Sequence, residues 1–140
     1  MSANSSREIR STVTNEGTLE LSIAVQERPV PGDNEVLLEV GAAPINPSDL
    51  ALLISFAAKL DTLSVSGSGD QTVTSMELHP AMMGALKPRM GESMPVGNEG
   101  GGVVVDAGVN AKHLIGKTVG AAGGAMYSEY RCLPAHSCLV

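Results

Sequence analysis

The sequence predicts a mainly β domain that carries only short helices. Residues 18–25 and 35–40 alternate apolar with polar or small side chains, which is the period of a strand with one buried face. Residues 95–108 run from a glycine cluster into three valines, a pattern typical of a tight bend that leads into a short buried strand. Apolar residues at helical spacing occupy one clear stretch, residues 50–57. We therefore expect a hairpin-rich β domain.

The length of 140 residues is enough for one domain with its own core. It is too short for a catalytic domain together with a full cofactor-binding domain. The chain holds two Tyr, one Phe and no Trp, so its core must consist of aliphatic side chains and methionine. The net charge of −6 argues against a nucleic-acid partner.

The first residues lack the apolar segment of a secretory signal, so we expect a cytoplasmic protein. The longest apolar run, residues 50–58, is too short to cross a bilayer, and no membrane partner is expected. Cys132 and Cys138 do not make a disulfide framework and should stay reduced.

The strand at 18–25 should bury one face, formed by Leu19, Leu21, Ile23 and Val25. Residues 1–6 are small and polar, and we expect them to be frayed. Residues 117–122 and 126–133 are further predicted strands.

Residues 46–49, Asn-Pro-Ser-Asp, precede the helical stretch. Asn46 suits the N-cap and Pro47 the first helical position, and the charge of Asp49 would meet the helix dipole in the first turn. A helix cap explains these residues without any substrate, although capping and the lining of a cleft are compatible.

Residues 61–93 lose regularity and are predicted to be an insertion. Within them, 64–70 is expected to be a flexible tract, 71–78 a short strand, and 80–86 a brief helix that Pro88 ends. A lid over the cleft is one hypothesis for this segment.

The glycine cluster at 95–108 does not have the order of a dinucleotide-binding loop. In that motif the glycines follow a strand and open a helix, whereas here they precede the predicted strand. We therefore expect the glycines to shape the wall of a cleft.

Three blocks of sequence, residues 35–50, 95–108 and 124–135, together resemble the N-terminal, GroES-like catalytic domain of the medium-chain dehydrogenase/reductase superfamily, on its quinone oxidoreductase branch. They match the family's strand-plus-helix start, its Gly-x-Glu-Gly bend and its Gly-Ala-x-x-Glu-Tyr strand. The resemblance implies a GroES-like, partly open β-barrel over residues 1–140.

In zinc-dependent relatives, a cysteine ligand occupies the position that matches Asn46, and a histidine ligand the position that matches Asn98. Neutral amides replace both poorly, so the resemblance implies no zinc. It points instead to quinone or enone reductases, which pass a hydride from NADPH to a small-molecule substrate. The Rossmann domain that would hold NADPH is expected to be absent from this chain and to belong to the full-length protein.

The same resemblance implies the roles of five residues. Asn46 would hold a substrate carbonyl and Ser48 would relay a proton, while Asp49, Asn98 and Glu99 would line or support the cleft. From its position between glycines alone, Glu99 is more often a buried, hydrogen-bonded carboxylate than a base.

Other readings stay open beside this one. The segment from Cys132 to Cys138, with His136, could hold a metal, but structural strand residues are the simpler interpretation. His79 and His113 are expected to be solvated. The chain alone should be inactive. The alternative function is a stand-alone GroES-like binding or assembly module, and a zinc enzyme with displaced ligands is a further alternative. A homodimer is compatible with each of these functions.

Overall fold

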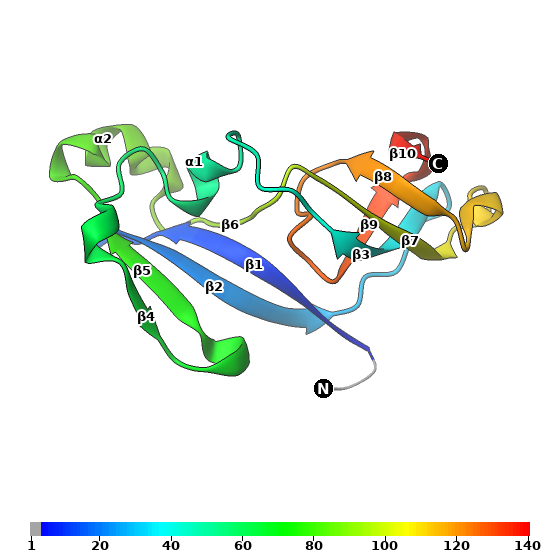
Figure 1. The fold of residues 1–140 in the computed structure, drawn as a ribbon, viewed down its shortest axis with the longest axis horizontal. Helices are drawn as coiled ribbons and strands as arrows, with labels where there is room; N and C mark the ends of the chain where they lie inside the picture. Colours follow the sequence, from blue (N-terminus) through cyan, green and yellow to red (C-terminus); the bar gives the residue numbers. More distant parts are fainter. Residues whose placement is uncertain (1–3) are drawn as a thin grey trace. The chain divides into compact units, whose positions relative to one another are not determined.

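The computed structural model describes residues 4–140 of this mainly β chain (Figure 1). The chain divides into two compact units. The first contains residues 4–8, 25–45 and 97–140, and the second contains residues 9–24 and 46–96. Among the described residues, no helix is long and apolar enough to cross a membrane.

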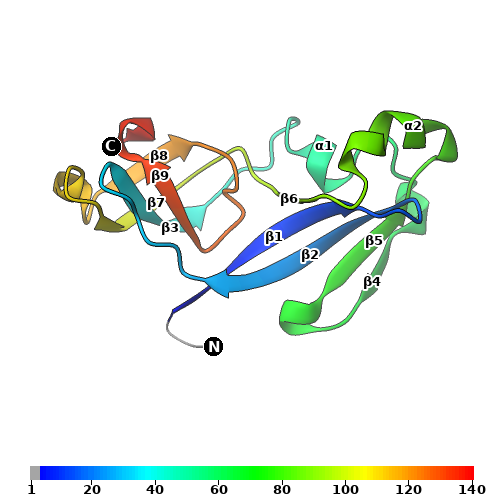
Figure 2. The ribbon, with the colours of Figure 1, turned by 180° about the vertical axis from the view of Figure 1, so that it is seen from behind.

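The first unit is built on an antiparallel sheet with the strand order β10-β8-β7-β3-β9. Its strands are β3 (Glu35–Ala42), β7 (Glu99–Ala107), β8 (Thr118–Ala122), β9 (Tyr130–Pro134) and β10 (Cys138–Leu139). Single 3₁₀ turns, η5 (Lys112–Leu114) and η6 (Ala135–Ser137), connect some of them. The sheet curls into half a barrel, as the sequence predicted, and Figures 1 and 2 show it from its two sides.

The core of the first unit lies against β3 and its neighbours. Val36, Leu38, Val104, Met126 and Leu133 are all at most 1% exposed. The predicted alternation fails in β3, because Leu37 between the two buried residues is itself only 3% exposed. β3 pairs with both β7 and β9, so it is an internal strand, where continuous apolar runs are usual.

The second unit contains most of a sheet with the order β4-β5-β2-β1-β6. Its strands are β1 (Ser5–Val13), β2 (Thr18–Glu27), β4 (Ser64–Ser66), β5 (Val73–Glu77) and β6 (Ser93–Pro95). β1 begins and β2 ends in the first unit. The helical segments are α1 (Leu50–Leu53), α2 (Met83–Leu86), η1 (Leu60–Thr62), η2 (Gly69–Gln71), η3 (Pro80–Met82) and η4 (Lys87–Arg89).

A separate core holds this second unit together. Val13, Leu19, Ala57, Met76 and Leu78 are buried, and several partly buried side chains pack on them. Of the four residues expected to form the buried face of β2, only Leu19 is buried. Leu21 and Ile23 are partly buried, and Val25 is 51% exposed near the end of that strand, so the expectation is wrong for Val25. Frayed residues were expected to extend to position 6, but β1 begins at Ser5; residues 1–3 lie outside the described part.

The predicted flexible tract at 64–70 is also wrong. These residues form β4, which pairs antiparallel with β5, and the turn η2 that follows it. The strand expected within 71–78 is confirmed as β5. The helix expected at 80–86 is present as η3 followed by α2, and Pro88 lies directly after α2 in η4.

The glycine cluster lies inside a strand and not before one. β7 begins at Glu99, so Gly100 to Gly102 are strand residues, and the predicted bend is wrong. A Cβ on Gly102 would lie 1.9 Å from the carbonyl oxygen of Glu39, so the β3 and β7 backbones approach too closely for a side chain there. The predicted strand at 126–133 is shorter, because β9 begins at Tyr130.

Candidate functional site

The sequence-predicted site residues belong to different units. Asn46, Ser48 and Asp49 lie in the second unit, at the entrance to α1, and Asn98 and Glu99 lie in the first, at the start of β7. We describe the two groups separately.

A closed turn shapes the first group. The Oδ2 atom of Asp49 accepts the backbone N–H of Asn46 at 2.8 Å, and the backbone N–H of Asp49 donates to the carbonyl oxygen of Asn46 at 2.9 Å. Asp49 is only 2% exposed, so this carboxylate is a fixed part of the backbone turn. The carboxylate therefore closes the turn that leads into α1 and does not cap the helix itself.

The helix boundary differs from the prediction. Asp49 and not Asn46 is the N-cap residue of α1, with φ −74° and ψ −26°, and the helix runs for four residues. The chain turns once through Pro47 before the first α-helical hydrogen bonds form, which moves the start of α1 to Leu50. Ser48 is exposed in this turn and Asn46 is half-buried.

A groove of about 670 Å³ opens on the first unit. Its lining combines the start of β7, part of β8, the segment after β3 and one residue of β10: Ala42, Ala43, Pro44, Glu99, Gly100, Gly101, Gly120, Ala121, Ala122 and Leu139. Glycine and alanine dominate this lining, so the groove is wide and apolar, and its side chains project little into it. Its volume lies in the range of small-molecule sites.

Glu99 is the charged residue of this lining, and it is exposed. The expectation that Glu99 is buried is therefore wrong. β7 begins at this residue, and its partner in β8 is Ala122 at the end of that strand, so the position lies at the margin of the sheet. A carboxylate at the mouth of an apolar groove disfavours anionic molecules and tolerates neutral ones.

The segment before Glu99 is fixed by the loop that precedes β9. The carbonyl oxygen of Asn98 accepts N–H groups from Gly123 at 3.1 Å and Gly124 at 3.3 Å. Gly97 has φ +93°, and a Cβ there would lie 2.6 Å from the ring of Tyr127. Glycine is therefore needed at this position for both conformation and space.

Tyr127 contributes to this arrangement, although its role was not predicted. Its hydroxyl group donates to the carbonyl oxygen of Pro44 at 2.9 Å, which links the loop before β9 to one wall of the groove. The sequence held no signal for this bond, since a tyrosine hydroxyl can donate to the carbonyl oxygen of any residue.

The described residues do not fit a dinucleotide. Phosphate groups are held where a strand passes through glycines into a helix N-terminus, but Gly100 to Gly102 lie within β7, and the α-helices α1 and α2 contain four residues each. Nor do the residues that the structure describes bring together three or more His, Cys, Asp or Glu side chains as a metal ion would require.

The segment that was weighed as a metal site does not gather three potential metal ligands among the described residues. Cys132 lies in β9 and Cys138 in β10, which are the two outer strands of the first unit's sheet order, and His136 is exposed in η6. Burial raises the pKa of both thiols, so neither is a ready thiolate at neutral pH.

No family model matches the chain, and no curated protein matches its sequence. Solved structures do match its fold. A protein from Bacillus thuringiensis that is assigned as an NADPH:quinone reductase is 23% identical with a TM-score of 0.61, and the match covers 96% of this chain and 33% of that one. A mycobacterial protein in complex with NADPH is 20% identical with a TM-score of 0.56, covering 95% and 31%. A mutant enoyl thioester reductase from Candida tropicalis is 15% identical with a TM-score of 0.53, covering 96% and 33%.

The chain thus spans about a third of the length of the structures that it matches. At these identities the likeness is one of fold. The chain has the GroES-like fold that solved NADPH:quinone reductases and enoyl reductases share, as the resemblance to the quinone oxidoreductase branch of the medium-chain dehydrogenase/reductase superfamily predicted.

Proposed function

We propose that this chain is the N-terminal catalytic domain of a cytoplasmic, zinc-independent quinone or enone reductase whose nucleotide-binding domain lies outside these 140 residues. The observation that carries the proposal is the shared fold with NADPH:quinone reductases, of which this chain spans about a third. The lack of fit between the described residues and a dinucleotide supports the assignment of NADPH to another domain.

The apolar groove of the first unit supports a substrate of matching chemistry. A quinone or an enone is neutral, flat and mostly apolar. A lining of glycine and alanine accommodates such a molecule and requires no particular polar group on it. Glu99 at the groove would reject anionic analogues by charge repulsion.

Independently of the groove, the turn before α1 in the second unit holds the two polar residues whose roles the resemblance implies. The amide of Asn46 can donate to a carbonyl oxygen, and the hydroxyl of Ser48 can pass a proton to the reduced product. Asp49 acts on this turn by holding the backbone N–H of Asn46, so it is a positioning residue. When NADPH is bound in the complete protein, it supplies the hydride.

The first experiment tests where the cofactor binds. The isolated chain is titrated with NADPH while nicotinamide fluorescence is followed, and we expect no saturable change. Micromolar binding by these residues alone would contradict the assignment of the cofactor to another domain.

The second experiment tests the reaction. The chain is joined to the part of the Bacillus thuringiensis protein that the match does not cover, and oxidation of NADPH is followed with 1,4-benzoquinone and with an enone. We expect turnover in this fusion. Ser48→Ala should lower kcat by about a hundredfold, the usual contribution of a positioned proton donor.

Ser64→Ala is the matched control, since Ser64 is also an exposed serine of the second unit. It should leave kcat unchanged, and equal activity of Ser48→Ala and Ser64→Ala would remove Ser48 from the mechanism. A folded fusion that binds NADPH and quinone but shows no turnover would favour the alternative function, a stand-alone binding or assembly module.

A further inference from the structure

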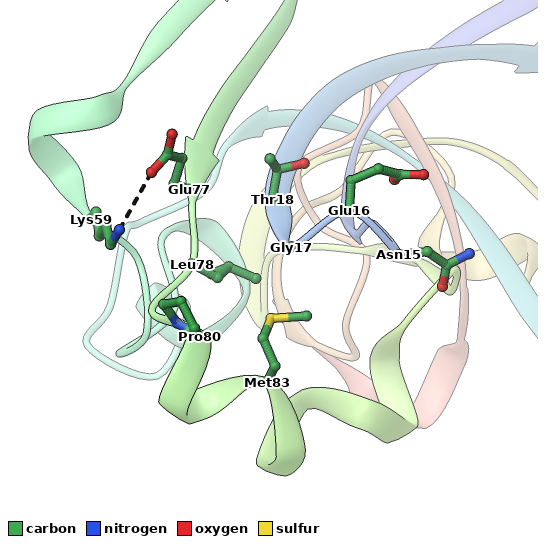
Figure 3. A pocket seen from close by; sticks show the side chains of 9 residues that line it. All are labelled: Asn15, Glu16, Gly17, Thr18, Lys59, Glu77, Leu78, Pro80 and Met83. Atoms are coloured by element: carbon green, nitrogen blue, oxygen red, sulfur yellow. Dashed lines mark hydrogen bonds and ion pairs between the residues drawn. The ribbon is translucent and has the colours of Figure 1, made fainter.

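The inserted segment, residues 61–93, belongs to the second unit, as does α1. It contributes to the core of that unit, because Met76 and Leu78 are only 1% and 4% exposed there. Figure 3, drawn around a hollow on this unit, shows Leu78 and Met83 directed toward Gly17 in the turn between β1 and β2. The N–H of Leu78 also donates to the carbonyl oxygen of Gly17 at 2.9 Å. The inserted segment is therefore fixed to β1 and β2.

The helix α1, by contrast, depends on its neighbours for its position. It has four residues, none of which is buried, and a single helical turn is not stable in water on its own. The turn that leads into it is closed by the buried carboxylate of Asp49, which accepts the N–H of Asn46. The far end of the helix needs a partner from another element.

Ser11 of β1 is this partner. Its hydroxyl group donates to the carbonyl oxygen of Leu52 at 2.5 Å. Carbonyl groups in the last turn of a helix have no acceptor role within the helix, so Ser11 satisfies a group that α1 itself leaves open. Ser11 is 0% exposed, and water therefore does not compete for this bond. The bond fixes the end of α1 to β1.

Arg89 connects this bond to the inserted segment. Arg89 lies in η4, and its Nη2 donates to Oγ of Ser11 at 3.2 Å and to the carbonyl oxygen of the same residue at 3.4 Å. The hydroxyl of Ser11 thus accepts a hydrogen bond from Arg89 while it donates one to Leu52. Hydrogen bonds in such a chain polarise and strengthen one another. Two side chains therefore connect η4, β1 and α1.

The charge of Arg89 is poorly compensated. Within residues 4–140 Arg89 forms no ion pair, and its Nε is buried without a hydrogen-bond partner. Burial lowers the pKa of Arg89 for the same reason, since the cation loses hydration that no carboxylate replaces. An apolar side chain of similar length would therefore cost the fold little stability. Stability does not explain the arginine at this position, whereas its bond to Ser11 does.

We propose that Arg89 is a positioning residue of the reduction: through Ser11 it holds α1, and with α1 the turn that carries Asn46 and Ser48. This inference rests on the proposed function, which assigns those two residues to the substrate. In this role the inserted segment supports the turn and does not open and close over it.

The first test uses the isolated chain and needs no turnover. Amide hydrogen exchange is measured by NMR in Arg89→Met. The amides of Leu53 and Ile54, whose hydrogen bonds form α1, should exchange faster by about fivefold or more, and so should the amide of Asn46. The midpoint of thermal unfolding should stay close to that of the unaltered chain.

Matched variants show whether the effect follows the chain of hydrogen bonds. Lys87→Met, which removes an exposed cation from the same turn η4, should change no exchange rate. The amide of Leu78 should exchange at an unchanged rate in every variant. Ser11→Ala should accelerate the α1 amides at least as much as Arg89→Met, and the double variant no more than Ser11→Ala alone, because both residues act through one chain.

The second test uses the same fusion as the test of the reaction. Arg89→Met should lower kcat by about tenfold or more, at an unchanged dissociation constant for NADPH. It should also raise the solvent deuterium isotope effect on kcat, because a displaced Ser48 slows the proton transfer. A variant that only unfolds part of the population would lower kcat in proportion to its folded fraction and leave the isotope effect unchanged. Lys87→Met should retain both values.

Equal exchange of the α1 amides in Arg89→Met and Lys87→Met would overturn the proposal. Faster exchange together with an unchanged kcat and isotope effect would also overturn it, since α1 would then move without consequence for the reaction. Lack of turnover by the unaltered fusion would count against the proposed function instead. The exchange rates do not depend on turnover, so the two failures are distinguishable.

Discussion

Arg7 and Glu129 hold each other through their main chains and side chains at once. The Nε of Arg7 donates to Oε1 of Glu129 at 2.9 Å, and the backbone N–H of Arg7 donates to Oε2 at 2.9 Å. In return the backbone N–H of Glu129 donates to the carbonyl oxygen of Arg7 at 2.9 Å. The start of β1 is thereby fixed to the segment that enters β9, within the first unit.

Arg7→Met should lower the free energy of unfolding by about 1 kcal/mol, because it breaks a charge-assisted, multiply bonded pair. The value is modest because both side chains are 38% exposed and water screens their charges. Chemical denaturation at neutral pH measures the change. Lys112→Met, which removes another exposed cation of this unit, is the control and should have no effect.

The same pair makes the free energy of unfolding depend on pH. The side-chain and backbone hydrogen bonds from Arg7 lower the pKa of Glu129 below its usual 4.5 in the folded state. The unfolded chain therefore takes up this proton more readily, so the pair stabilises the fold above pH 4.5 and loses this effect as the pH falls through the lowered pKa. Arg7→Met should flatten the dependence of stability on pH in this window, and an unchanged slope would contradict the assignment.

Two glycines of the first unit should respond differently to the same substitution. Gly102→Ala should cost about 3 kcal/mol or prevent folding, because its Cβ would lie 1.9 Å from the carbonyl oxygen of Glu39. Gly120→Ala should change stability by less than about 0.5 kcal/mol, since no atom lies within 4 Å of a Cβ there. Thermal unfolding of both variants measures these two changes in stability.

Gly120 also lines the groove, so a larger side chain at this position should fill it without disturbing the sheet. In the fusion with a nucleotide-binding domain, Gly120→Leu should raise the KM for the quinone severalfold and leave NADPH binding unchanged. Gly116→Leu is not a usable control, because Gly116 has φ +82°. Lys117→Leu, on an exposed residue outside the groove, serves instead.

Asp49 should matter for stability more than its sequence neighbours do. Asp49→Ala removes the buried carboxylate that accepts the Asn46 N–H and should cost about 1 to 2 kcal/mol. Asp49→Asn keeps an oxygen acceptor and should cost less. Denaturation curves of both variants, with Ser64→Ala on an exposed serine of the same unit as the control, measure this structural role.

Local patterns predicted the elements better than their boundaries. The alternation in residues 18–25 and 35–40 identified β2 and β3, since a strand's period depends only on its two faces. The buried state of Leu37 could not be predicted, because it follows from the position of β3 between β7 and β9. Sheet order is a property of distant segments, and no single stretch of sequence contains it.

The glycine cluster shows the same limit. Its composition predicted a close approach of backbones, which the structure has, but the partner is Glu39 of the adjacent strand and not a bend in the chain. At the candidate site, the sequence predicted that a polar turn precedes a helix. It did not predict that Asp49 would close the turn, because either Asn46 or Asp49 could cap it and only burial selects between them.

The two cysteines provide a last prediction, on reactivity. Burial raises the pKa of Cys132 and Cys138, and at Cys132 the charge of Glu35 raises it further, against the opposing effect of Arg131. Since only the thiolate is alkylated, both should react with iodoacetamide at pH 7.5 more slowly than a free cysteine, and their rates should still rise above pH 9. Glu35→Gln should accelerate alkylation of Cys132 and leave Cys138, where no charged neighbour contributes, unchanged. Peptide mapping by mass spectrometry resolves the two sites, and equal acceleration at both would show that the variant loosens the sheet and does not act through its charge.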